Sequence, residues 1–190
     1  MKLERILSFA KLLLEKAVKP GDIAIDATVG NGHDTLFLAE LVGSDGKVFG
    51  FDIQEQALES CRVKVQEQSL AERVTLFQKG HQYVAESVPT TLHGKVTGAI
   101  FNLGYLPGGD KSIVTTPETT ISAIKQILQI LAPEGIIVIV IYHGHPQGQI
   151  ERDNLLEYVK NLDQKDAHVL NYQFLNQKNN PPFIIAIEKR

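Results

Sequence analysis

The sequence has a single cysteine, Cys61, among its 190 residues. An intrachain disulfide framework is therefore excluded, which favours a reducing compartment such as the cytoplasm. Hydrophobic residues make up 43% of the chain, enough for one domain with a sizeable core at this length but too little sequence for two full domains. We expect one domain over residues 1–190.

Long apolar runs are also missing. The longest candidate, GIIVIVIY at residues 135–142, is much shorter than the roughly 18 residues needed to span a bilayer, and it suits a strand buried on both faces. The first 20 residues carry charges every few positions and lack the uninterrupted apolar core of a secretory signal. We expect a soluble cytoplasmic protein that has no membrane partner.

An excess of positive charge is missing as well, because the formal net charge is −3. No global basic field gathers nucleic acid, which argues against binding to long duplexes. A small structured RNA needs only a few local lysines or arginines near one pocket, so that partner stays compatible with the sequence.

Strand-like and helix-like segments alternate along the chain. The expected strands cover residues 23–29, 47–53, 74–80, 96–106 and 136–145, and the expected helices cover residues 3–17, 30–43, 54–70 and 118–135. This order predicts an α/β fold with a Rossmann-like, doubly wound and mostly parallel sheet. Residues 168–176 and 182–190 face each other across QKNNPP, which predicts a C-terminal antiparallel hairpin and seven strands in total.

The stretch DATVGNGHDT, residues 26–35, lies where the first strand gives way to a helix. Open parallel sheets bind ligands at this end of a strand, and Gly30 and Gly32 allow a sharp turn close to a ligand. A nicotinamide-binding loop has a third glycine three positions later, but this chain has Thr35 there. The Asp26 carboxylate would repel a pyrophosphate and attract a cation, directly or through water. The stretch therefore favours a positively charged ligand.

Asp52 ends the second strand, 26 residues after Asp26. An acidic residue at this position commonly accepts hydrogen bonds from the two hydroxyls of a ribose. The alternative is that Asp52 caps the helix that follows.

Asp26, the pair Gly30 and Gly32, and Asp52 together resemble the cofactor site of the class I S-adenosylmethionine-dependent methyltransferases. The resemblance covers essentially the whole chain and implies S-adenosyl-L-methionine as the cofactor. It places Gly80-His81-Gln82 near the adenine, with a plain loop as the alternative. The residues that it implies for cofactor binding are Asp26, Thr28, Gly30, Asn31, Gly32, His33, Asp34, Asp52, Gln54, His81 and Asn102.

Asn102-Leu103-Gly104-Tyr105, after the fourth strand, resembles the Asn-Pro-Pro-Tyr type motif of amino-group methyltransferases. The Asn102 side-chain oxygen and the Leu103 carbonyl would accept both hydrogens of an amine, and Tyr105 would stack on a planar base. Leu103-Gly104 replaces the two prolines of that motif, so an exocyclic base nitrogen is not the only plausible acceptor. An ordinary loop with a capping asparagine is the alternative.

YHGHPQG, residues 142–148, follows the fifth strand on the same rim. His143 or His145 would take a proton from an alkylammonium acceptor, and Tyr142 is a candidate contact to the substrate. A metal site would need Cys61, His33 or His81 to complete it, and no Cys-x-x-Cys partner exists. We expect no metal; histidines with only a loop or core role are the alternative.

DATVGNGHDT, NLGYLPGGDK and YHGHPQG in combination resemble small bacterial methyltransferases named as rRNA methylases. That resemblance implies methylation of the 5-aminomethyl group of a 2-thiouridine at the tRNA wobble position, with the anticodon loop as partner. Lys111 and Arg152 are candidate phosphate contacts by position. An rRNA or small-molecule methyltransferase, a nicotinamide oxidoreductase and a silent nucleotide-binding module remain the alternatives, and the sequence is compatible with a homodimer.

Overall fold

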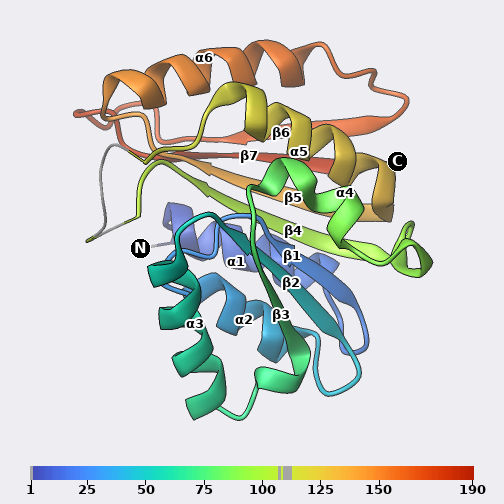
Figure 1. The fold of residues 1–190 in the computed structure, drawn as a ribbon. Coiled ribbons are helices and arrows are strands. Elements are labelled where there is room, and N and C mark those ends of the chain that lie inside the picture. Colours follow the sequence, from blue (N-terminus) through green and yellow to red (C-terminus); the bar gives the residue numbers. More distant parts are fainter. Residues whose placement is uncertain (1, 107, 109–112) are drawn as a thin grey trace.

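The computed structural model describes residues 2–106, 108 and 113–190. Seven strands form one sheet in the order β3-β2-β1-β4-β5-β7-β6 (Figure 1). The strands are β1 Ile23–Asp26, β2 Lys47–Asp52, β3 Val74–Gln78, β4 Val96–Leu103, β5 Leu131–Ile141, β6 Ala167–Tyr172 and β7 Phe183–Lys189.

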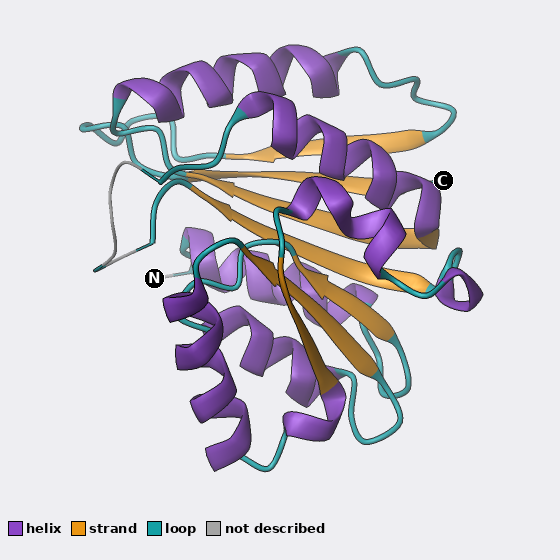
Figure 2. Cartoon of the chain, in the orientation of Figure 1, coloured by secondary structure: helices purple, strands orange, loops and turns teal. Residues whose placement is uncertain are grey.

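Helices cover both faces of this sheet (Figures 1 and 2). On one face lie α1 Ile6–Ala17, α2 His33–Leu41 and α3 Glu55–Glu67, and on the other lie α4 Val84–Ser87, α5 Pro117–Ile130 and α6 Pro146–Lys160. Three short 3-10 turns, η1 Ala71–Arg73, η2 His81–Tyr83 and η3 Thr90–Leu92, flank β3 and α4. The predicted three-layer α/β architecture is confirmed.

The five strands β1 to β5 pair in parallel, whereas β7 runs antiparallel to both β5 and β6. The C-terminal hairpin predicted from the sequence is thus present. Its second strand, β7, lies inside the sheet between β5 and β6. The first strand of the hairpin, β6, forms the edge.

The central strands are apolar throughout because both of their faces are covered. Side chains of β5 alternate between two cores: Ile137 and Ile139 join the core under α4, α5 and α6, and Val138 and Val140 join the core over α1, α2 and α3. All four are at most 1% exposed. Burial of apolar side chains therefore holds the helices on both faces of the sheet. Polar functional groups are left to the strand ends and the loops.

The structure differs from the predicted elements between β3 and β4, in the helix α6 and at the ends of several elements; β1 and β4, for example, each end three residues earlier than expected. The helix α6 is absent from the prediction, and only a short helix and 3-10 turns connect β3 to β4. The helix α5 ends at Ile130, not at residue 135, because β5 begins at Leu131. Glu134, with φ of 63°, and the neighbouring Pro133 break the helical pattern there.

The carboxyl ends of the parallel strands meet at one edge of the sheet, where the loops after β1, β2, β4 and β5 gather (Figure 2). Within the described part of the chain, none of the helices is both long and apolar enough to cross a membrane.

Candidate active site

A cavity of about 1100 Å³ opens at this edge of the sheet. Its walls come from the loops that follow the first five strands, from the start of α5 and from the α1 residues Leu7, Ser8 and Lys11. The first helix therefore faces the cavity in addition to covering the core. These three α1 residues belong to the site although the sequence motifs do not include them.

The loop after β1 takes its shape from two glycines. Gly30 and Gly32 have φ of 49° and 79°, in the left-handed region that strains other residues. A Cβ at Gly32 would also lie about 3.0 Å from Cys61 on α3. Gly30 lines the cavity, whereas Gly32 packs behind it. Gly32 thus has a packing role in this structure, and its expected contact with the cofactor stays a prediction.

Asp26, at the end of β1, binds the loop after β1 and the start of α2 through its side chain. Its carboxylate accepts hydrogen bonds from the Thr35 hydroxyl at 2.6 Å and from the Thr28 backbone N–H at 3.1 Å. The side chain is fully buried and does not line the cavity. Burial, more than the neighbouring carboxylate of Asp34, raises the pKa of Asp26 to about 7. In this structure the Asp26 carboxylate is bonded within the loop and lies outside the cavity lining; its expected attraction of a cationic ligand, directly or through water, stays a prediction.

Asp52 faces the cavity from the end of β2. Its two oxygens accept one backbone N–H each, from Gly30 at 2.9 Å and from Gln54 at 2.9 Å. The helix α3 has Gln54 at its N-cap position, so the capping alternative for Asp52 does not hold. A carboxylate oxygen accepts more than one hydrogen bond; both oxygens therefore retain capacity for the two hydroxyls of a ribose.

Asn102 and Asp34 both line the cavity and contact each other. The Asn102 amide nitrogen donates to the Asp34 carboxylate at 2.6 Å, and the Asn102 backbone N–H donates to the Thr28 hydroxyl at 2.7 Å. Burial raises the pKa of Asp34, while the Lys11 ammonium, the Asn102 amide and His33 act in the opposite direction. Because a carboxylate only accepts, Asp34 fixes the orientation of the amide and leaves the Asn102 side-chain oxygen as an acceptor for another group.

Tyr105 and Tyr142 form an aromatic rim next to Asn102. Both line the cavity and are 41% and 39% exposed. The Tyr105 ring meets the His145 ring edge to face, with 5.8 Å between centroids. Leu103 also lines the cavity but is 1% exposed. The rim therefore places two partly exposed aromatic side chains at the mouth of the cavity.

His143 is held on both of its ring nitrogens. Nε2 lies 2.9 Å from the Pro181 carbonyl, and Nδ1 lies 3.1 Å from the Arg152 guanidinium. The guanidinium only donates, so Nδ1 accepts and Nε2 donates. This arrangement leaves His145 as the better placed of the two histidines to receive a proton.

Arg152 does not line the cavity, because its guanidinium contacts His143 and the Asp153 carboxylate. The expected phosphate contact at Arg152 stays a prediction, for a side chain that is 26% exposed and already makes these intramolecular bonds. Lys111 lies outside the described residues.

His81 lines the cavity with its ring turned inward. Nδ1 lies 3.0 Å from the Ala27 carbonyl, and the ring packs edge to face on Phe101. Burial lowers the pKa of His81, so its neutral form is favoured. His81 thus contacts the backbone of the loop after β1. Its expected position near the adenine stays a prediction.

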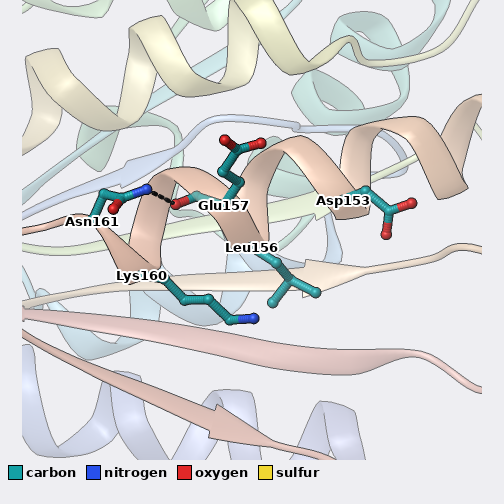
Figure 3. A pocket seen from close by; sticks show the side chains of 5 residues that line it. All are labelled: Asp153, Leu156, Glu157, Lys160 and Asn161. Atoms are coloured by element: carbon teal, nitrogen blue, oxygen red, sulfur yellow. Dashed lines mark hydrogen bonds between the residues drawn. The ribbon is translucent and has the colours of Figure 1, made fainter.

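The remaining predicted cofactor residues, Thr28, Asn31, His33 and Gln54, all line the cavity. Among the residues with described positions, no group of three histidine, cysteine or acidic side chains is placed to hold a metal ion. A second hollow lies along α6, and its lining residues are Asp153, Leu156, Glu157 and Lys160 of that helix and the Asn161 that follows it (Figure 3). It gathers no described residues from other helices or strands.

Comparison with known proteins identifies this arrangement. The family model described as "Putative rRNA methylase" matches residues 48–188. The chain belongs to this family. Among its relatives, the chloroplastic tRNA (mnm(5)s(2)U34)-methyltransferase of Arabidopsis thaliana is 36% identical over 95% of this chain and 68% of its own length.

Two solved structures have the same fold along their whole lengths. A putative rRNA-methylase from Clostridium thermocellum is 43% identical with a TM-score of 0.96, and the alignment covers 100% of both chains. SMU.1697c, a putative methyltransferase from Streptococcus mutans in complex with SAH, is 42% identical with a TM-score of 0.89 over 99% of both chains. The expectation of an S-adenosylmethionine-dependent methyltransferase is confirmed, which decides against the nicotinamide and silent-module alternatives.

Proposed function

We propose that this rRNA methylase family member methylates the amino group of 5-aminomethyl-2-thiouridine at the wobble position of tRNA, which gives 5-methylaminomethyl-2-thiouridine. The observation that supports this substrate best is the Asp34–Asn102 hydrogen bond of 2.6 Å, because it turns an acceptor oxygen toward an incoming amine. The 36% identity to a protein named for the same nucleoside agrees with it.

The donor side of the cavity fits S-adenosylmethionine. Asp52 retains two acceptor positions for a ribose, and Gly30 allows the backbone to approach a ligand closely. Thr28, Asn31, His33 and Gln54 line the same wall. When bound, the cofactor supplies a methyl group on a positively charged sulfur, and its transfer needs a neutral nucleophile held in line with the carbon–sulfur bond.

The acceptor side would position the amine. The Asn102 side-chain oxygen and the Leu103 carbonyl accept the two N–H groups, so the nitrogen lone pair points away from both. The nitrogen forms its new bond to carbon as the bond from carbon to sulfur breaks. His145 accepts the proton that the amine must lose, before transfer from the ammonium or after it from the methylated product.

An anticodon loop suits the open rim of this cavity. Its bases are already unpaired, so little unstacking energy is needed to bring the modified uridine into the site. Tyr105 and Tyr142 provide stacking surfaces at the mouth, and Lys11 places positive charge in the cavity wall. Lys79 lines the same wall, where its ammonium pairs with the Glu86 carboxylate at 3.2 Å. The local charge of Lys11 attracts a phosphate backbone although the chain as a whole has a net charge of −3.

Nucleoside mass spectrometry tests this proposal. In tRNA from host cells that lack the gene, 5-aminomethyl-2-thiouridine should accumulate and the methylated nucleoside should disappear. The wild-type gene should restore the product, whereas the Asn102→Ala gene should not. Purified protein with S-adenosylmethionine should methylate tRNA from the deletion strain but not its rRNA. An unchanged tRNA profile, or methyl incorporation into rRNA instead, would overturn the assigned substrate.

A further inference from the structure

Glu151 on α6 is a buried carboxylate behind the cavity wall. The residue is 2% exposed, and none of the ion pairs formed within the described ranges 2–106, 108 and 113–190 involves it. Removing a carboxylate from water without a cation costs stability, and an apolar side chain would fill a buried helix position at a lower cost. Burial accordingly raises the pKa of Glu151, against the effect of its hydrogen bonds.

The contacts of Glu151 are two threonine hydroxyls. Thr115 donates to one carboxylate oxygen at 2.6 Å, and Thr120 donates to the other at 2.7 Å. Both threonines come from other parts of the fold, Thr115 from the segment before α5 and Thr120 from α5 itself. Glu151 therefore joins α6 to α5 and to the segment directly before α5.

Thr115 in turn contacts the loop after β4, which contains Gly104. Its hydroxyl accepts the Gly104 backbone N–H at 3.0 Å, and its own backbone N–H donates to the Gly104 carbonyl at 3.1 Å. A hydroxyl has one hydrogen; its donation to Glu151 keeps a lone pair directed at Gly104. Gly104 has φ of 138° and follows Asn102-Leu103 directly, so this contact fixes the loop next to the proposed amine-binding atoms.

We infer that Glu151 is a positioning residue for methyl transfer, which holds Asn102-Leu103-Gly104 in place through the hydroxyl of Thr115. The inference rests on the proposed function for its catalytic consequence and on the hydrogen-bond geometry for its structural part. Misplacement of a reacting group by about 1 Å lowers rates up to about 100-fold. Loss of Glu151 therefore lowers kcat and leaves the donor wall, built from β1 and β2, unchanged.

The test compares Glu151→Gln and Thr115→Val with Glu157→Gln. Glu157 is an exposed glutamate on the same helix (Figure 3). Amide hydrogen exchange at Gly104 should become about 10-fold faster in the first two variants and stay unchanged in the third. With tRNA from the deletion strain, kcat should fall about 10-fold in the first two variants, with KM for S-adenosylmethionine unchanged. The double variant should be no slower than Thr115→Val.

Two results would overturn the inference: unchanged exchange at Gly104 in a folded Glu151→Gln protein, or equal losses of cofactor binding and kcat. The exchange measurement needs no RNA. If the wild-type protein transfers no methyl group to tRNA but Gly104 responds to Glu151→Gln, the proposed substrate fails and the loop-holding role stands.

Discussion

The side-chain amide of Asn102 and the carboxylate of Asp34 lie 2.6 Å apart, although 68 positions separate them in the sequence. This contact joins the first turn of α2, which follows the loop after β1, to the carboxyl end of β4. One hydrogen bond thus connects the side of the cavity proposed for the cofactor with the side proposed for the amine. It orients the Asn102 side-chain amide, whose oxygen is proposed to accept a hydrogen bond from the amine.

Asn102→Asp should separate binding of the donor from catalysis. The substitution keeps the shape of the side chain but places a second carboxylate against Asp34, so the two groups repel each other and the amine loses an oriented acceptor. We expect kcat on tRNA to fall about 100-fold, while calorimetry still detects binding of S-adenosylmethionine. Asn154→Asp, at an exposed site on α6, should keep wild-type kcat. Full activity of Asn102→Asp would contradict the assigned role.

Asp52→Asn should weaken cofactor binding. Each Asp52 oxygen faces a backbone N–H, so an amide nitrogen at either position sets donor against donor and disturbs the loop at Gly30. A loss of about 10- to 100-fold in affinity for S-adenosylmethionine is expected by calorimetry. Asp45→Asn removes an exposed carboxylate between α2 and β2 and serves as the control. Equal affinities of the two variants would remove Asp52 from the donor site.

The two histidines after β5 should give different phenotypes. His143→Gln loses at least one of two hydrogen bonds, to Arg152 and to Pro181, and should lower the free energy of unfolding by about 1 kcal/mol in urea titrations. His145→Gln should leave stability unchanged, lower kcat and flatten the rise of kcat with pH that a general base produces. A wild-type pH profile in His145→Gln would exclude it as the base.

Asp26 should make the protein less stable as the pH rises. Burial raises its pKa from 3.8 to about 7 in the folded state; between these values the folded protein holds a proton that the unfolded chain has lost. Stability contributed by this group is complete below about pH 4 and is lost as the pH rises through about 7, by about 4 kcal/mol. Asp34 and Glu151, whose pKa values are also raised, act in the same direction.

Unfolding by urea at several pH values measures this effect. Asp26→Asn keeps an acceptor for the Thr28 N–H and lets the Thr35 hydroxyl accept, so the variant should fold. Its free energy of unfolding should decline less between pH 4 and 7 than that of the wild type. Parallel curves for the two proteins would show that Asp26 does not carry this dependence.

Much of the fold follows from patterns that the sequence displays locally. The run from Ile136 to Ile141 is apolar at every position because two helical layers cover it, and the turn-rich QKNNPP segment marks the hairpin. The helix α6 is not recognised from its sequence, because PQGQIERDNLLEYVK buries few apolar side chains, Leu155 and Val159 among them. Its glycine and its charged residues leave no clear apolar stripe at helical spacing.

The site could be predicted as a set of loops, but not as a set of contacts. Motif spacing placed Asp52 and Asn102 at the cavity, where the structure has them. Spacing could not show that Asp26 lies under the loop, since an aspartate at a strand end looks the same in sequence whether it faces a ligand or a threonine. Glu151 shows no signal because most helical glutamates are exposed. Its burial depends on where α6 packs against α5.

The position of β7 between β5 and β6 constrains the order in which the sheet assembles. Strand β6 comes first in the chain, but the strand it pairs with in the sheet is β7, so it joins the sheet together with residues 183–189 or after them. Pro181, the carbonyl partner of His143, lies two residues before the start of β7. The histidine rim of the cavity can therefore reach its final form only once the C-terminal hairpin has docked on β5.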